Sequence, residues 1–175
     1  MSLADLTAAF GVCVINTFKM FKSFIASAAV AVSTVVAPVA AEAASLTPGQ
    51  SQLLNVLDAS GVTVEAGECP TDEALGWFIP KKKFIAICTN VVDSEASAWE
   101  TLRHEAVHAA QMCVDPSMES TVLKYSFLKK YGDPQDWKFI KSAYHFSDWM
   151  IELEAFTLMR LSNSQIAEFV AKSCL

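Results

Sequence analysis

Two histidines and a glutamate lie close together in a segment that is typical of a helix. His104 and His108 are four residues apart, so on a helix both imidazoles project from one face, one turn apart. This spacing suits two nitrogen ligands of a single Zn²⁺ ion at about 2.0–2.1 Å each. Glu105 directly follows His104, and there its carboxylate can take a proton from a metal-bound water and pass it to a leaving amine. The three residues therefore predict a catalytic zinc site.

The pattern is H-E-x-x-H, and a catalytic zinc ion normally has three protein ligands and a water. A third ligand is therefore expected on a later helix. The segment Ile151–Phe156 offers two glutamates, Glu152 and Glu154. Because residues two apart are separated by about 200° around a helix, only one of these carboxylates can face the metal.

These two segments resemble the gluzincin metallopeptidases of the zincin class. In several gluzincin families the third ligand is the first glutamate of an E-x-E-A-D motif, on a helix that follows the active-site helix. Glu152 matches this first position, and Ala155 matches the small residue that lets the helices approach closely. Phe156 stands where those families carry an aspartate that usually orients a ligand histidine. The resemblance thus implies Glu152 as the third ligand, and Glu154 is the alternative.

The resemblance covers residues 84–160 at most, and it is strong only in residues 101–111 and 151–156. It does not extend to the metzincins, which require glycine and histidine where this chain has Gln111 and Val114. It implies a small zincin-like fold, a Zn²⁺ cofactor and hydrolysis of peptide bonds in a peptide or protein substrate. The strand Phe84–Cys88 is similar to the edge strand with which zincins bind an extended substrate.

Further polar residues before Glu152 could assist the reaction. His145 lies seven residues before Glu152, hence on nearly the same face of a continuous helix. Its imidazole could stabilise the oxyanion of a tetrahedral intermediate, as second histidines do in related peptidases, and the hydroxyl of Tyr144 could do the same. Asp148 is one turn before Glu152 and could replace the missing aspartate. Gln111 continues the face of the two histidines and could bond to the surroundings of the site.

Local patterns before residue 94 predict one helix and three short strands. Thr47, Pro48 and Gln50 have the types expected at a capped helix start, and Gly61 is typical of a helix end. The last two strands flank Pro80–Lys83 and are expected to form a hairpin with its lysines at the turn. The expected strands are Val62–Val64, Gly76–Ile79 and Phe84–Cys88.

From Ser94 onward the patterns are helical. The helix that carries H-E-x-x-H is expected from about Glu95 to Cys113. Further helix starts are marked by Pro116, Pro134, Ser147 and Ser162. This order predicts a single α+β domain, with three short antiparallel-type strands followed by a helical bundle whose first helix carries the motif.

The N-terminal segment has the features of a secretory signal peptide. Lys19 and Lys22 precede an uncharged run of nineteen residues, 23–41, and small residues follow it up to Ala44. A positive flank, an apolar stretch and small residues at the end are typical of a cleaved signal. Such a signal would occupy residues 1–44, with Met20 as a compact alternative start, and would leave a domain of residues 45–175. The alternative is a membrane anchor through residues 23–41.

The cysteines are consistent with export to a periplasmic or extracellular compartment. Four cysteines fall in residues 45–175, and an even number suits two disulfides in an oxidising environment. Three connectivities are possible, and buried free thiols are the alternative to all of them. The favoured pairs are Cys69–Cys88, which flanks the expected hairpin, and Cys113–Cys174.

Composition and charge limit the possible partners. The chain has a net charge of −6 and no basic run long enough to bind phosphates, which argues against nucleic acid as a partner. A membrane partner is expected only if the N-terminal segment is retained. The favoured function is zinc-dependent peptide hydrolysis with Glu105 as the general base. The alternative is a non-catalytic exported binding or structural protein, in which His145 or Asp148 supplies a fourth ligand to a structural zinc ion.

Overall fold

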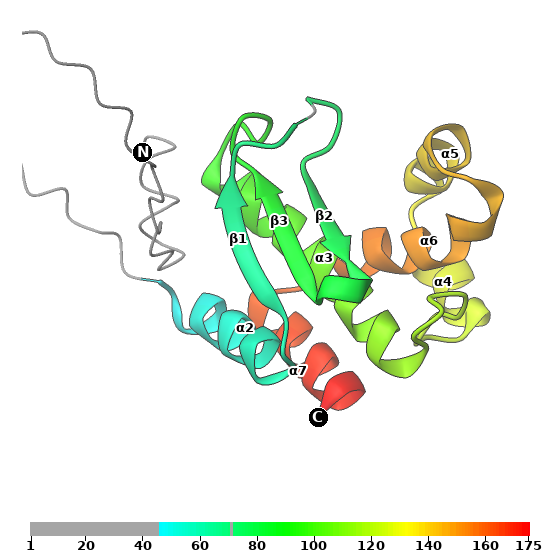
Figure 1. Ribbon diagram of the computed structural model, residues 1–175. Helices are drawn as coiled ribbons and strands as arrows, with labels where there is room; N and C mark the ends of the chain where they lie inside the picture. The colour runs from blue at the N-terminus through cyan, green and yellow to red at the C-terminus, as the bar shows by residue number, and fades with distance from the viewer. Residues whose placement is uncertain (1–45, 71) are drawn as a thin grey trace, which may run out of the picture.

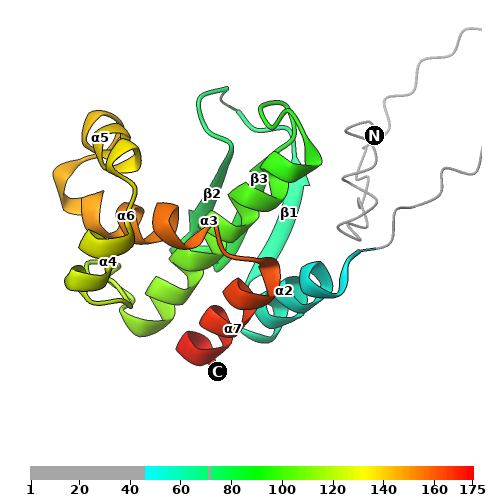
Figure 2. The ribbon, with the colours of Figure 1, turned by 180° about the vertical axis from the view of Figure 1, so that it is seen from behind.

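A small sheet and one long helix form the centre of the fold in the computed structural model, which describes residues 46–70 and 72–175. The expected signal sequence, residues 1–44, lies outside the described residues. Helix α3 (Glu95–Val114) lies against one face of the sheet, as the two opposite views in Figures 1 and 2 show. None of the described helices combines the length and apolar character needed to cross a bilayer.

The sheet has three strands, β1 (Thr63–Gly67), β2 (Gly76–Ile79) and β3 (Phe84–Cys88), in the order β1-β3-β2. Strands β2 and β3 form the expected antiparallel hairpin through the 3₁₀ turn η1 (Pro80–Lys82). The expectation of antiparallel strands throughout is wrong, because β1 pairs with β3 in parallel. The chain reverses twice between β1 and β3, so the two strands run in the same direction, and the sheet is mixed.

Strand β2 lies at an edge of the sheet, so β2 rather than β3 has a free edge that a substrate could contact. Phe84–Cys88 was the strand expected at the edge, but β3 has a neighbour on each side and is the central strand. Strand β2, the first strand of the hairpin, is an edge strand, and it packs against α3. Gly76 makes this close approach possible, since a Cβ atom there would lie 2.7 Å from both the Ala86 carbonyl oxygen and Thr101 Cγ2.

The remaining helices form two groups that pack around α3. Helices α2 (Pro48–Ala59) and α7 (Asn163–Cys174) lie side by side, and α7 also packs along α3. Helix α6 (Trp149–Leu158) crosses α3, and it supports the short helices α4 (Tyr125–Tyr131) and α5 (Pro134–Ala143). Side-chain caps define the starts of α2, α3 and α7, where Thr47, Ser94 and Ser162 each accept a backbone N–H.

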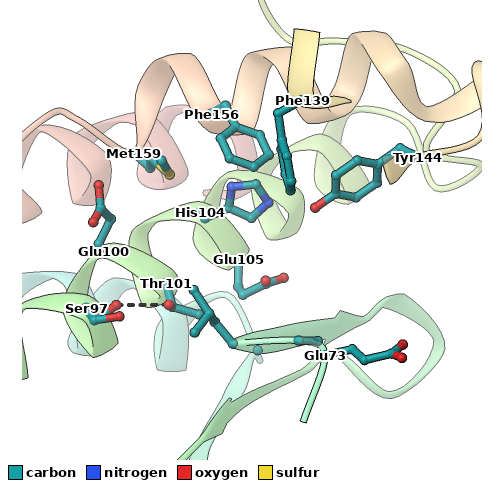
Figure 3. A pocket seen from close by; sticks show the side chains of 13 residues that line it. Glu73, Ser97, Glu100, Thr101, His104, Glu105, Phe139, Tyr144, Phe156 and Met159 are labelled. Atoms are coloured by element: carbon teal, nitrogen blue, oxygen red, sulfur yellow. Dashed lines mark hydrogen bonds between the residues drawn. The ribbon is translucent and has the colours of Figure 1, made fainter. Parts of the chain in front are cut away.

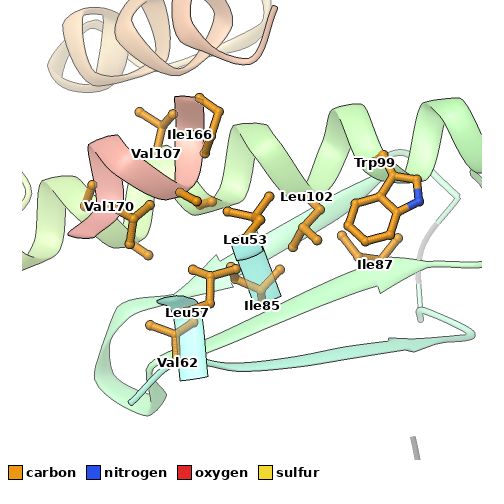
Figure 4. Close-up of a cluster of buried hydrophobic side chains, with 14 of the residues drawn as sticks. Leu53, Leu57, Val62, Ile85, Ile87, Trp99, Leu102, Val107, Ile166 and Val170 are labelled. Carbon is orange, nitrogen blue, oxygen red and sulfur yellow. The ribbon is translucent and has the colours of Figure 1, made fainter. Parts of the chain in front are cut away.

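Two hydrophobic clusters stabilise this arrangement. The larger one joins the sheet to α2, α3 and α7, and Figure 4 shows Leu53, Ile85 and Leu102 at its centre. The smaller one contains Leu128, Ile140 and Leu153, and it attaches α4 and α5 to α6. Because α3 is covered by the sheet, α6 and α7, its buried residues occupy nearly all of its circumference. Polar groups that project from the middle of α3 are therefore removed from bulk water.

The two disulfides are those favoured from the sequence. Cys69–Cys88 ties the loop after β1 to the end of β3, and the side chain of Asn90 bonds to the backbone of Cys69 at the same place. Cys113–Cys174 ties the C-terminal end of α3 to that of α7. The closed loops hold together elements that are distant in sequence, which restricts the unfolded chain.

Candidate metal centre

The crossing of α3 and α6 brings His104, His108 and Glu152 together. The two histidine Nε2 atoms lie 3.1 Å apart. The carboxylate oxygens of Glu152 lie 3.3 Å from His104 Nε2 and 3.5 Å from His108 Nε2. The three ligand atoms all lie within 4.8 Å of one another, and all three residues are buried. The group could therefore hold a metal ion.

The charges in this cluster fit a bound cation. Glu152 Oε2 is buried, and its neighbour in the described residues is His104 Nε2 at 3.3 Å, which makes no well-formed hydrogen bond with it. A buried carboxylate oxygen without a good hydrogen bond costs free energy, and a cation placed between it and the two imidazole nitrogens removes that cost. Two histidine nitrogens and one carboxylate are also the donor set of several catalytic zinc sites. The residues present fit a divalent metal.

Without a metal, the same cluster stabilises a proton on His108. Burial by itself would lower the pKa of His108, but the hydrogen bond to Glu152 and the charges of Glu105 and Glu152 outweigh it and raise this pKa to about 9. Burial would likewise raise the pKa of Glu152, but the hydrogen bonds and charges of the two histidines lower it to about 2. A proton and a metal ion therefore compete for the same place.

Gln111 connects His108 to a second buried glutamate. Its Oε1 lies 2.7 Å from His108 Nδ1 and can accept the proton there, which leaves Nε2 as the ring nitrogen available to a metal ion or to Glu152. Its Nε2 donates to Glu154 Oε2 at 2.8 Å and to the Ile151 carbonyl oxygen at 2.9 Å. Gln111 and Glu154 are both fully buried. This network holds the orientation of the His108 ring.

Glu154, the alternative third ligand, is placed away from the two imidazoles. Its carboxylate accepts the backbone N–H groups of Val122 and Leu123 as well as the amide of Gln111. It thereby attaches the loop before α4 to both α3 and α6. The sequence argument that only one of the two glutamates can face the metal agrees with this placement, and the structure gives that place to Glu152.

Phe156, the departure from the gluzincin motif, contacts the other histidine. Its ring lies edge-on against the His104 ring, with 4.8 Å between the centroids. Packing therefore restrains His104 at the point where an aspartate would act through a hydrogen bond. Asp148 does not take over that task, because no hydrogen bond joins it to either histidine in the described residues, and its carboxylate accepts from Ser147 at 2.7 Å.

Glu105 is buried beside the cluster, on the side of the edge strand. Burial raises its pKa, while the two histidines and the backbone N–H of Phe78 act in the opposite direction. Figure 3 shows the side chains of His104, Glu105 and Tyr144 around one hollow. The carboxylate is therefore close to the metal ligands, faces the hollow and has an increased affinity for protons, as a general base requires.

Two adjoining hollows meet at this place. One has a volume of about 360 Å³ and the other about 440 Å³. The first is bounded by apolar side chains, including Phe139 and Met159, and the second extends along β2 to Asp148 and Glu152. Both are lined by Ala74, Gly76, His104, Glu105 and Tyr144. Together they form a cleft that runs past the ligand cluster.

Of the two residues considered for oxyanion stabilisation, the structure brings only Tyr144 into the cleft. Burial and the charges of Glu152 and Glu105 raise the pKa of the Tyr144 hydroxyl, so it stays protonated and can donate. His145 is exposed, lines neither hollow, and its Nδ1 lies 2.9 Å from the Ser147 hydroxyl. His145 does not share a helix face with Glu152 as the sequence predicts. Helix α6 begins only at Trp149, and His145 precedes a 3₁₀ turn, η2 (Phe146–Asp148).

The Gln111–Glu154 network generates a prediction about metal affinity. We expect Gln111→Leu to weaken zinc binding by about 10–100-fold, because the His108 ring loses its hydrogen-bond acceptor. The control Glu168→Gln, which changes an exposed carboxylate on α7, should bind zinc normally. Competition with a chromogenic chelator measures the affinity, and NMR of the His108 Nδ1 proton reports the bond. Equal affinities in all variants would contradict the role of Gln111.

The pKa of His108 generates a second prediction, for the metal-free protein. The folded pKa of about 9 lies above the ordinary 6.5, so the protonated imidazole stabilises the fold fully below pH 6.5. This contribution is lost as the pH rises toward 9. We expect the free energy of unfolding to fall over that range in chelator, and to fall less in His108→Asn. Saturating zinc should remove this fall in the wild type, because the metal takes the place of the proton, and identical pH profiles of both proteins in chelator would contradict the role of His108.

Comparisons with known proteins give no family assignment. No family model matches this chain, and neither the curated proteins nor the solved structures searched contain a similar one. The α+β architecture and the buried His104–His108–Glu152 group are properties of the chain itself. Its relation to the zincins is an expectation that depends on residues 101–111 and 151–156.

Proposed function

We propose that the chain is a zinc-dependent peptidase. The observation that supports this most directly is the buried convergence of His104, His108 and Glu152, with Glu105 beside them at the cleft. Within the described residues, neither His145 nor Asp148 belongs to the ligand group. A site with three protein ligands has a position left for water or substrate, whereas a structural zinc site is closed by four. This favours catalysis over the structural alternative.

The residues around the site can divide the chemistry of peptide hydrolysis among them. Zn²⁺ held by His104, His108 and Glu152 would supply Lewis acidity to the carbonyl and to water. Glu105 accepts the proton of the attacking water and delivers it to the leaving amine, a task that its position beside the ligands at the cleft favours. The protonated hydroxyl of Tyr144 donates a hydrogen bond to the oxyanion that forms at the carbonyl.

Strand β2 provides a place for the substrate backbone. It is an edge strand, and Gly76, Trp77 and Phe78 line the hollow that contains the ligands. An extended peptide can pair with the free N–H and C=O groups of such an edge. The edge would then hold the scissile bond beside Glu105. Export is part of the proposal, since two disulfides suit an oxidising compartment.

The assignment of Glu105 predicts a separation of metal binding from activity. Glu105→Gln should retain zinc and lose peptide hydrolysis by about 10²–10⁴-fold, because the proton acceptor is removed. Glu152→Gln should lose zinc as well, and Glu168→Gln, which changes an exposed carboxylate on α7, should alter neither property. Metal analysis and mass spectrometry of a cleaved peptide library make the measurement. Zinc binding without any Glu105-dependent cleavage would refute the peptidase.

Tyr144 and His145 are neighbours in the sequence, and the structure predicts different roles for them. Tyr144→Phe should lower kcat by about 10²-fold with little change in KM, because the lost hydroxyl acts on the oxyanion and not on the bound substrate. His145→Gln should leave kcat nearly unchanged, since that side chain lines neither hollow of the cleft. Steady-state kinetics on one cleaved peptide decide between the two, and the opposite pattern would restore His145 as the stabilising residue.

A further inference from the structure

The region formed by α4, α5 and η2 has an unusual surface. Eight large hydrophobic side chains are exposed in the described part of the chain, and five of them lie between residues 125 and 146. These five are Tyr125, Phe127, Tyr131, Phe139 and Phe146. Phe139 lines the cleft, but the other four are outside it. Single exposed rings are common, whereas a concentration of them indicates an interaction surface.

Four aromatic residues of this region either contact one another or line one hollow. The Trp149 ring contacts Phe146, with centroids 5.0 Å apart, and Trp137, with centroids 5.8 Å apart. A hollow of about 240 Å³ between α4 and α5 is lined by both Trp137 and Tyr125. Lys141 Nζ lies 4.6 Å from the Trp137 centroid and 5.6 Å from that of Trp149. We define the strip as Tyr125, Trp137, Phe146 and Trp149 with Lys129 and Lys141.

Positive charge surrounds the strip. The segment 124–146 contains five lysines, all exposed: Lys124, Lys129, Lys130, Lys138 and Lys141. Its two acidic residues, Asp133 and Asp136, face Arg160, which binds Asp136 at 2.6 and 2.9 Å and lies 4.0 Å from Asp133. Arg160 thus offsets one of the two negative charges, and the five lysines outnumber the one that is left. The strip is basic although the whole chain carries a net charge of −6.

We propose that this strip binds the surface of an anionic lipid bilayer. Lysines attract anionic headgroups at close range, while tryptophan, tyrosine and phenylalanine rings are accommodated at the boundary between headgroups and acyl chains. Phe146 is 74% exposed and is the ring best placed to enter that boundary. An acidic protein is repelled by such a surface elsewhere, so the basic strip also determines the orientation in which it binds.

This inference is independent of the metal centre, but it has a consequence for it. Helix α5 carries Trp137 and Lys141 on the strip and Phe139 at the cleft. Binding through the strip therefore brings the cleft close to the membrane surface. No spanning segment is needed, since the contacts are interfacial.

Vesicle binding tests the proposal with the full chain. We expect the protein to sediment with vesicles of phosphatidylcholine and phosphatidylglycerol, not with phosphatidylcholine alone, and binding to weaken as salt increases. Lys129→Gln with Lys141→Gln should lower the affinity by about fivefold for each lysine, and Phe146→Ser by about tenfold. The matched control is Lys81→Gln with Lys82→Gln, which removes the same charge at the exposed hairpin turn and should bind normally.

Tryptophan fluorescence identifies the surface that is used. Trp137 and Trp149 should shift to shorter wavelength on binding to anionic vesicles, and Trp137→Phe with Trp149→Phe should lose the shift while the protein still sediments. Circular dichroism and zinc content, unchanged in all variants, show that folding is intact. The proposal is overturned if anionic vesicles are not bound at low salt, or if the hairpin lysines matter as much as those of the strip. Self-association that covers the strip, seen by light scattering, would overturn it too.

Discussion

The arrangement of the site depends on one electrostatic constraint. Two imidazole nitrogens and a carboxylate are buried within a few ångströms of one another at the crossing of α3 and α6. Such a group is unfavourable in the interior unless a cation or a proton compensates the negative charge and the lone pairs. Burial of α3 on almost every side makes the constraint strict, because solvent reaches these atoms only from the cleft. Some of the surrounding residues hold the ligands in place, and others line the cleft through which the ligands are reached.

The two histidines are held by different means. His108 is oriented through Gln111 and Glu154, a buried hydrogen-bond chain that also includes the backbone before α4. His104 is restrained by the ring of Phe156, which packs against it. A hydrogen-bonded ligand and a packed ligand can be equally well oriented, so the loss of the aspartate at position 156 does not leave the site without support. The chain achieves the geometry with a different set of neighbours.

Much of this could be predicted from local pattern, and the rest depends on contacts between distant segments. The spacing of His104 and His108 and the hairpin of β2 and β3 are properties of single segments, so the sequence predicts them directly. The parallel pairing of β1 is not local, because it depends on where the intervening loop places β2. His145 was assigned by helical spacing across a boundary at which no helix continues. The bonds between Gln111 and Glu154 join residues 43 positions apart, and neither residue type alone indicates them.

The contact of α7 with α2 and α3 links the hydrophobic core to the metal ligands. Ile166, Ala167 and Val170 of α7 belong to the core, and Cys174 is bonded to Cys113. Helix α3 therefore packs against α7 over part of its surface and carries His104 and His108 on another part. Local opening of α7 would expose apolar surface of α3 and disturb the helix that positions both histidines.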